Sequence, residues 1–508
     1  MKDLEKRTIK MIVLTLAMVF GVVASRPMCA EAAVVNVNNF ADLQSKLQNG
    51  YSVKLTANIT VPTNESIMVD NGNVILDLNG YTIDFNQNYG IMIFSQLTLK
   101  DSRVNGKIKN CAGPIIDMGI NAEFNLEGGE LSNCEADGVM VGLDDTFNMS
   151  GGKICNNKRS GVVINSGATF NMTGGEISNN EEYGVECRGT FKMSGTSKIC
   201  NNDGCGFYGL TNSAINMDGG EISGNHDGGA QINSVFTMTG GKIINNERTK
   251  DYANGAGVNL IRSNAVFTMS GGTISGNWLE DKDTENGAGV YVYDGATFKI
   301  SGAPVISDNY QGGTKGNDGK FTGARKSNVF INNSLINSHP NFIVVGKLTG
   351  AEGSIGVLLE CDMFNITKND NCSYFVKGND EENSEYELTD SDMKVFFSDK
   401  SKYNVYLYQE LNKAVLLTEW GYIATEAGNA SEDSDNPTVI KLKKDYNLTK
   451  DELVRLEIVQ DTYVVIDMNG YNIKKVGECG YPLISNNGNL ILTDNSTGAI
   501  KGCIDGNG

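Results

Sequence analysis

The residues best suited to catalysis are acidic, imidazole and basic side chains in three short segments. Asp144 and Asp145 are adjacent, His226 lies further along the chain, and Arg248 and Lys250 follow it. A pair of carboxylates can act as the acid and the base in glycoside hydrolysis, and a histidine or a basic group can move a proton. Side chains of these types could therefore act as general acids and bases, provided that the fold brings them together.

A second group of residues suits ligand binding. Trp278 is one of only two tryptophans, and we expect it to stack on a sugar ring beside nearby tyrosines in loops that carry recognition. The alternating acids of Asp281-x-Asp283-x-Glu285 suggest a Ca²⁺ loop, but Asn286 stands where such a loop needs glycine, so calcium is weakly supported. The predicted ligand-binding residues are Tyr252, Trp278, Asp281, Asp283, Glu285, Tyr291 and Tyr293.

These residues lie in a repeat of the form aromatic-x-Met-x-Gly-Gly-x-Ile-x-x-Asn. Clear copies begin at Phe147, Phe170, Phe236 and Phe267, and looser copies begin at Phe124, Phe191, Ile215 and Phe298. A second element, Gly-Val-x-Val or a variant, recurs between the copies, as at Gly138 and Gly161. The phenylalanine and methionine are two residues apart and so face one side of a strand, and the glycines allow a sharp turn.

Each repeat predicts three short strands with no room for a crossover helix, and a single coil cannot bury its own apolar face. We therefore predict an all-β fold, a right-handed parallel β-helix in which each phenylalanine stacks on the next and the asparagines form an amide ladder. Two repeats are longer than the others, with inserts at 247–253 and 278–285 that should stack on one flank. The alternative to a binding site there is a pair of loops held by surface charges, Lys250 near Asp281 and Asp251 near Lys282.

Cys111 and Cys134 follow equivalent asparagines, Asn110 and Asn133, in neighbouring coils. Stacking would place their Cα atoms about 4.8 Å apart, which is within the range of a disulfide. The pair is predicted either to form a disulfide or to remain as two stacked thiols.

The ends of the repeat region have their own signals. Residues 40–50 have helical spacing and should cap the first coil. The segment 465–473 echoes 76–83, so a second β-helix begins near the end of the chain, and we expect the sequence to be a truncated piece of a longer protein. The predicted divisions are a signal peptide at 1–33, an N-terminal cap at 34–64, the β-helix at 65–345, a β-rich cap at 346–420, and a linker (exposed over 426–436) with the start of a second β-helix at 421–508.

Charge and the N-terminal segment limit the function classes. Residues 1–33 combine basic residues with a short apolar run, which predicts a secreted or cell-surface protein. No later stretch is long and apolar enough to predict a membrane helix. The net charge of −19 makes nucleic acid an unlikely partner, because like charges repel.

The repeats, the segment Leu76-Asp-Leu-Asn-Gly-Tyr-Thr-Ile83 and the segment Phe397-Ser-Asp-Lys-Ser-Lys-Tyr403 resemble the pectin-lyase-like right-handed β-helix superfamily, and within it repetitive, adhesin-like bacterial surface proteins. The superfamily includes enzymes, adhesins and inert stalks, so the resemblance implies the fold more than an activity. Its polygalacturonases carry paired aspartates, Gly-His-Gly and Arg-x-Lys on successive coils.

This chain departs from that catalytic arrangement. His226 lacks flanking glycines and lies about three coils from Asp145. Three coils span about 14 Å, whereas a catalytic acid and base lie within about 10 Å of each other. We therefore expect no catalytic residues and no metal, and predict a scaffold that adheres to a surface ligand such as a glycan; the alternative is a polysaccharide lyase or glycoside hydrolase.

Overall fold

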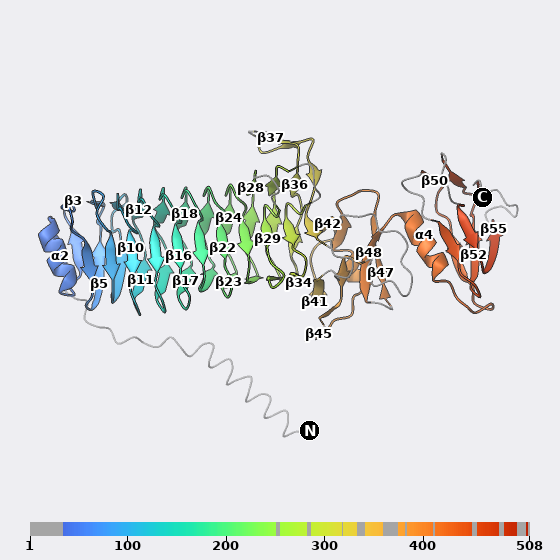
Figure 1. The fold of residues 1–508 in the computed structure, drawn as a ribbon, viewed down its shortest axis with the longest axis horizontal. Coiled ribbons are helices and arrows are strands. Elements are labelled where there is room, and N and C mark those ends of the chain that lie inside the picture. Colours follow the sequence, from blue (N-terminus) through green and yellow to red (C-terminus); the bar gives the residue numbers. More distant parts are fainter. Residues whose placement is uncertain are drawn as a thin grey trace, which may run out of the picture.

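The structure is a computed structural model of the 508-residue chain. It describes residues 34–249, 254–281, 286–316, 318–332, 341–358, 374–380, 384–409, 412–449, 455–476, 482–494 and 504–505. Most of these residues form an elongated stack of β-coils, with helix α2 at one end and a second, shorter stack beyond a cap (Figure 1).

One coil of the first unit shows how the repeat folds. Strand β14 (Thr146–Met149) is followed by β15 (Lys153–Cys155) and β16 (Val162–Ile164). Each of the three pairs in parallel with its counterpart one coil later, for example β14 with β17 (Thr169–Met172). Strands of the first kind form sheet A, which contains 16 strands, and the other two kinds form the 24-stranded sheet B. The predicted parallel stacking is confirmed.

The aromatic position of each repeat lines the core of the rod. Phe147 pairs in register with Phe170, and their rings stack with centroids 4.5 Å apart. Phe236, Phe267 and Phe298 form a second run of stacked rings. All of these side chains are fully buried, so each coil completes the apolar core of its neighbours and stabilises the stack through burial.

The repeat asparagines form the predicted ladder inside the rod. Each donates its Nδ2 to the Oδ1 of the next at 2.9–3.0 Å, and each backbone N–H donates to the same Oδ1 at 3.0–3.2 Å. Each bond between two ladder asparagines therefore runs toward the C-terminal end, while six of the Nδ2 groups also donate to an isoleucine carbonyl of the preceding coil. The ladder runs through Asn157, Asn180, Asn202, Asn225, Asn246, Asn277, Asn309 and Asn328.

The glycine of the Gly-Val element is a partner of this ladder. A Cβ added at Gly138 would lie 3.0 Å from Nδ2 of Asn157 and 2.4 Å from Cγ2 of Ile154. The same close approach recurs at Gly161, where Nδ2 of Asn180 would be 2.9 Å away. The two sequence elements thus form one contact, in which the amide occupies the space that a side chain would need.

Helix α2 (Phe40–Gln48) confirms the predicted N-terminal helix, and Leu43 and Leu47 pack against the first coil. The predicted boundary at residue 65 is too late, however. Strands β1 (Val35–Val37) and β2 (Val53–Leu55), on either side of the helix, already pair in parallel within sheet A. The helix is therefore an excursion from the first coils rather than a separate cap.

The other end of the first unit also extends past its predicted limit at residue 345. Strand β41 (Phe342–Leu348) continues sheet A, while β42 (Ile355–Leu358) and β46 (Phe396–Ser398) continue sheet B in parallel. The antiparallel pair β47 (Asn404–Tyr408) and β48 (Lys413–Leu417) then closes sheet A. Within the segment predicted as a cap, β42 and β46 therefore continue the stacked coils of the first unit.

Helix α4 (Glu419–Gly428) replaces the first part of the predicted linker. One face of the helix places Trp420 and Ala427 in the core of the second unit. On the cap side, Tyr422 stacks on Tyr406 of β47 with centroids 4.1 Å apart. The expected exposed linker is correct only for 432–436.

The second unit begins as the first does. In both units an aspartate Oδ1 accepts the backbone N–H of the asparagine two residues later, Asp77 with Asn79 at 2.9 Å and Asp467 with Asn469 at 3.0 Å. Each asparagine donates its Nδ2 to a carbonyl of the preceding coil at 2.9 and 3.0 Å. The predicted echo is thus confirmed in the hydrogen bonds as well as in the strands.

Candidate functional site

The described first residues of the two predicted inserts pair as expected. Strand β28 (Glu247–Arg248) pairs with β32 (Trp278–Leu279), which pairs with β36 (Tyr310–Gln311). Strand β39 (Arg325–Lys326) completes this small sheet as an antiparallel edge. Between β36 and β39, β37 (Thr314–Lys315) and β38 (Phe321–Thr322) form a hairpin that projects from the rod (Figure 1).

The hairpin changes the interpretation of Trp278. Its indole is only 8 % exposed, its Nε1 donates to the carbonyl of Gly312 at 2.9 Å, and its ring lies 6.3 Å from that of Phe321. Phe321 also stacks on Tyr310 at 4.6 Å. Stacking of Trp278 on a sugar, as the sequence suggested, would need a ring face that the hairpin covers, so in this structure Trp278 anchors the hairpin.

The other predicted binding residues that the structure describes differ in their exposure. Tyr291 is 4 % exposed, lies over Phe330 at 5.8 Å, and accepts a hydrogen bond from Nδ2 of Asn332 at 2.7 Å. Tyr293 is 40 % exposed, and Asp281 is half-buried. Outside the described residues lie Tyr252, Asp283, Glu285 and the expected charge partners Lys250, Asp251 and Lys282. In the described part of the chain, no group of three or more His, Cys, Asp or Glu side chains could hold a metal ion.

The acidic part of the catalytic set lies in a turn, in which Asp145 is buried and Asp144 is exposed. Asp145 is buried, its Oδ1 accepts the backbone N–H of Ala122 at 2.7 Å, and burial raises the pKa of its carboxyl. Its neighbour Asp144 has a φ of 61°, as a turn residue does. The pair thus shapes the turn before β14, and Asp145 faces inward rather than toward a substrate.

The histidine and the basic group belong to a different cluster, on the insert flank. His226 lies between two acids, with its Nδ1 3.2 Å from Asp203 Oδ1 and its Nε2 3.8 Å from Glu247 Oε1. Arg248 forms an ion pair with Asp227 at 3.0 Å and donates to the carbonyl of Asn254 at 2.6 Å. These groups satisfy one another, so the acid, histidine and basic segments do not form a common catalytic centre.

Cys111 and Cys134 occupy neighbouring coils, as expected, and both are buried free thiols. A hydrogen bond between the two sulfur atoms, together with burial, raises the pKa of Cys111. Cys134 also donates to the carbonyl of Gly113 at 2.5 Å. The two sulfurs are thus adjacent, and the disulfide between them stays a prediction.

A groove of about 490 Å³ crosses the outer face of sheet A, in a region for which we made no prediction from the sequence. It crosses β17, β20 (Thr190–Met193), β23 (Ala214–Met217) and β26 (Val235–Met238). Its lining residues are Asn171, Thr173, Lys192, Met193, Ser194, Asn216, Met217, Asp218, Thr237 and Thr239. The available signal was the irregular repeat spacing here, since the turn Ser194-Gly-Thr-Ser197 is one residue longer than the usual turn.

Three polar side chains that line this groove are exposed to solvent. Lys192 and Asn216 project outward from adjacent strands, and Asp218 follows directly after β23. Among the described residues, none of the three side chains has a hydrogen-bond or ion-pair partner within the protein. All three side chains are exposed to solvent, so a ligand in the groove would replace their hydrogen bonds to water and would not have to break a contact within the described part of the protein.

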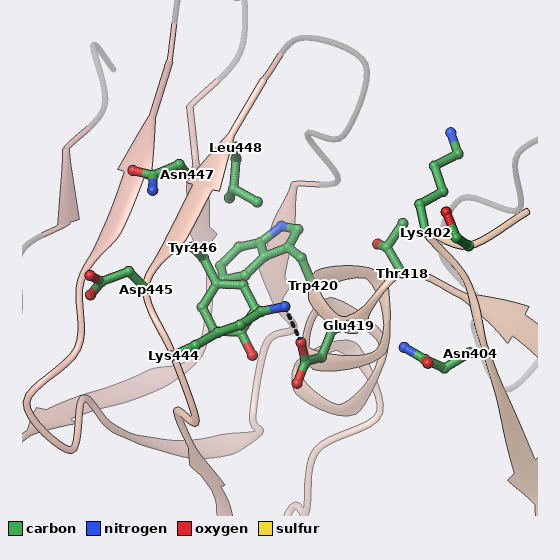
Figure 2. A pocket seen from close by; sticks show the side chains of 11 residues that line it. Lys402, Asn404, Thr418, Glu419, Trp420, Lys444, Asp445, Tyr446, Asn447 and Leu448 are labelled. Atoms are coloured by element: carbon green, nitrogen blue, oxygen red, sulfur yellow. Dashed lines mark ion pairs between the residues drawn. The ribbon is translucent and has the colours of Figure 1, made fainter.

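A larger cleft of about 690 Å³ lies between the cap and the second unit. Figure 2 shows Trp420 and Tyr446 side by side in it, with Lys402 and Asn404 on the opposite wall. Its charged groups are already engaged: Lys444 pairs with Glu419 at 2.6 Å, and Asp445 accepts two hydrogen bonds from Asn472 at 2.7 and 3.1 Å. These contacts serve the fold of the second unit, so the groove on sheet A is the stronger candidate.

No helix within the described residues is long and apolar enough to cross a membrane. No family model matches the sequence, and neither a curated protein nor a solved structure matches the chain.

Proposed function

We propose that the chain is a secreted or cell-surface scaffold that adheres to an uncharged glycan through the groove on sheet A. The observation that carries this proposal is the set of unpartnered side chains, Lys192, Asn216 and Asp218, in a hollow that crosses four stacked strands. An amide, an ammonium and a carboxylate supply the donors and acceptors that sugar hydroxyls need. The leader-like segment 1–33 and the likeness to pectin-lyase-like, adhesin-like bacterial repeats support the location and the class.

Charge favours a neutral ligand over a charged polymer. Lys192 and Asp218 carry opposite charges, so the groove itself is close to neutral, while the chain as a whole carries −19. A polyanionic glycan would be repelled by that surface, and a polycation would meet Lys192 at the centre of the groove. The extended hollow suits a chain of several sugar units lying along the rod.

The alternative is a polysaccharide lyase or hydrolase. In its favour is Asp145, a buried carboxyl whose raised pKa would suit a general acid. Against it, Asp145 is 1 % exposed and its Oδ1 is already bonded to the backbone N–H of Ala122. Binding without turnover is therefore the function that the geometry supports better.

The test is binding of the full chain to a panel of neutral and acidic oligosaccharides, with product release followed by mass spectrometry. We expect Lys192→Ala and Asp218→Ala each to weaken binding of a neutral glycan about tenfold, because a hydrogen bond to a charged group contributes about 1.5 kcal/mol. Lys242→Ala is the matched control, since Lys242 is exposed on sheet B. Cleaved products, or equal losses in Lys242→Ala, would contradict the proposal.

A further inference from the structure

The outward face of sheet B is apolar over the first coils of the rod. The third strand of each coil points its middle residue away from the core, and these residues form a column in which each pairs in register with the next. Three of the first four are methionines and one is an acid. They are Met68 in β4 (Ile67–Val69), Met92 in β7 (Ile91–Ile93), Asp117 in β10 (Ile116–Met118) and Met140 in β13 (Val139–Val141).

An aromatic ring lies on each side of this column. Tyr89 lies just before β7 and Phe94 directly follows it, and both side chains are exposed. Each ring lies across a glycine of the next coil. A Cβ added at Gly113 would lie 2.7 Å from Cδ1 of Tyr89, and one added at Gly119 would clash with Cδ1 of Phe94. The two glycines thus leave room for both rings on the surface.

The row that begins with Phe94 continues through the next two coils. Ile120 and Leu143 occupy equivalent positions, since each precedes a turn residue with a φ of 61°. The exposed fractions of Phe94, Ile120 and Leu143 are 50 %, 67 % and 52 %. Large apolar side chains that gather on adjacent coils, rather than singly, mark an interaction surface.

The far end of the same column is covered by the protein itself. It carries Tyr291, Phe330 and Leu358, which are buried and form a separate apolar cluster. The loop before β33 (Val290–Val292) lies against them, because a Cβ added at Gly287 would be 2.9 Å from Cβ of Phe330. Over the first coils, the exposed fractions show that no described residue covers the column in this way.

Asp117 gives the exposed end of the column a charge. Its side chain is half-buried between those of Met92 and Met140, and it has no hydrogen-bond or ion-pair partner among the described residues. Burial raises the pKa of its carboxyl, and a cation beside it would stabilise the ionised form. The rings of Tyr89 and Phe94 can also attract a cation through their faces. The surface is therefore complementary to a cation that lies among apolar side chains.

The same features disfavour two other occupants. A second copy of the chain carries a net charge of −19, so two copies would repel each other. A neutral glycan needs several donors and acceptors for its hydroxyls, and methionine offers only a weak acceptor. Methionine instead adapts its shape to varied apolar partners.

We propose that this surface binds a segment of a partner protein in which a lysine or arginine lies between apolar residues. The cation pairs with Asp117, and its apolar neighbours cover the methionines and the row from Phe94 to Leu143. Four coils span about 14 Å, the length of about nine helical residues. The site is separate from the groove on sheet A and does not depend on glycan binding.

The test is selection from a random twelve-residue peptide library, displayed on phage, against the full chain, followed by affinity measurements with the enriched peptides. We expect these to carry a lysine or arginine between apolar residues. Asp117→Asn should weaken their binding about tenfold, because one charge-assisted hydrogen bond is lost. Glu432→Gln, which removes an exposed acid elsewhere, is the matched control and should bind as the wild type does. No enrichment, enrichment of peptides without a cation, or equal losses in both variants would overturn the proposal.

A second variant tests the apolar part of the contact. Ile120→Asn should keep the unfolding midpoint, since Ile120 is exposed, and should weaken peptide binding about tenfold. Lys192→Ala, in the groove on sheet A, should leave peptide binding unchanged. Wild-type peptide affinity in Ile120→Asn would contradict the proposal. So would a wild-type dimer, seen by light scattering, that Ile120→Asn dissociates, or a loss of oligosaccharide binding in Phe94→Ala, because these would assign the surface to a second copy or to a glycan.

Discussion

Asn246 and Asn277 are 31 positions apart, yet the Nδ2 of Asn246 donates to the Oδ1 of Asn277 at 3.0 Å, the same distance that joins Asn157 and Asn180 across 23 positions. The longer coil therefore joins the ladder in the same register as the shorter coils. The hydrogen bonds between the asparagines set the register of the coils, and the length of the insert can differ from coil to coil.

Removing one ladder amide should destabilise the rod strongly. Asn202→Ala would leave the N–H groups of Asn180 without their acceptor in a buried position. Each buried unsatisfied donor costs about 1–3 kcal/mol, so the midpoint of chemical unfolding should fall clearly. Asn216→Ala, an exposed asparagine on sheet A, is the control and should leave the midpoint unchanged.

The glycines beside the ladder should not tolerate even alanine. In Gly206→Ala the new methyl group would lie 2.4 Å from Cγ2 of Ile222 and 3.0 Å from Nδ2 of Asn225. Overpacking of this kind costs about 1–3 kcal/mol. Thermal unfolding should show the loss, whereas Gly346→Ala, where the nearest atom is 3.4 Å away, should behave like the wild type. Equal stability of the two variants would refute the steric argument.

Trp278 should matter for the hairpin and not for the ligand. Trp278→Ala removes the ring that Phe321 covers and the donor to Gly312, and loss of a packed aromatic side chain costs about 3 kcal/mol. We expect faster proteolysis within 312–323 and unchanged binding of glycans. Loss of glycan binding with an intact hairpin would restore the original prediction of a sugar-stacking tryptophan.

Cys111 and Cys134 should form a disulfide when the chain folds under oxidising conditions. Their sulfurs are already hydrogen-bonded, and closing a loop of this length is worth about 3 kcal/mol. Peptide mapping without reductant should recover the two linked peptides. Cys155 is the internal control and should stay free, because its partners in the neighbouring coils are Ser132 and Ser178. Two free thiols at 111 and 134 would leave the stacked-thiol alternative.

The repeat could be predicted from sequence because equivalent residues recur in successive coils. Phe147 and Phe170 occupy equivalent positions, so the spacing alone gave the register that the strands adopt. Contacts that occur only once in the chain leave no repeat in the sequence, so they could not be predicted from it. Asp399 accepts the last hydrogen bonds of the ladder from Asn328, far away in sequence, and Trp278 is covered by a hairpin whose path no spacing reveals.

The missed helix and groove have different reasons. In α4 the apolar residues Trp420, Ile423 and Ala427 have helical spacing. The acidic and small residues that follow are typical of a linker, so the sequence pattern predicts no helix there. The groove on sheet A borders the longer turn before Lys198, and it is a candidate site because its outward side chains lack partners within the described residues. The second property depends on contacts in space, and sequence alone does not show it.

The contact of Asn157 with Gly138 in the coil before it, and its hydrogen bond to Asn180 in the coil after it, have a consequence for how such a rod changes in evolution. A duplicated coil brings its own amide, its own glycine and its own phenylalanine, so both new junctions are already complementary. When a whole coil is deleted, the two coils that become neighbours have complementary contact residues in the same way. Length is therefore a property that this architecture can vary by recombination in single steps, while the closing carboxylate of Asp399 need be present only once.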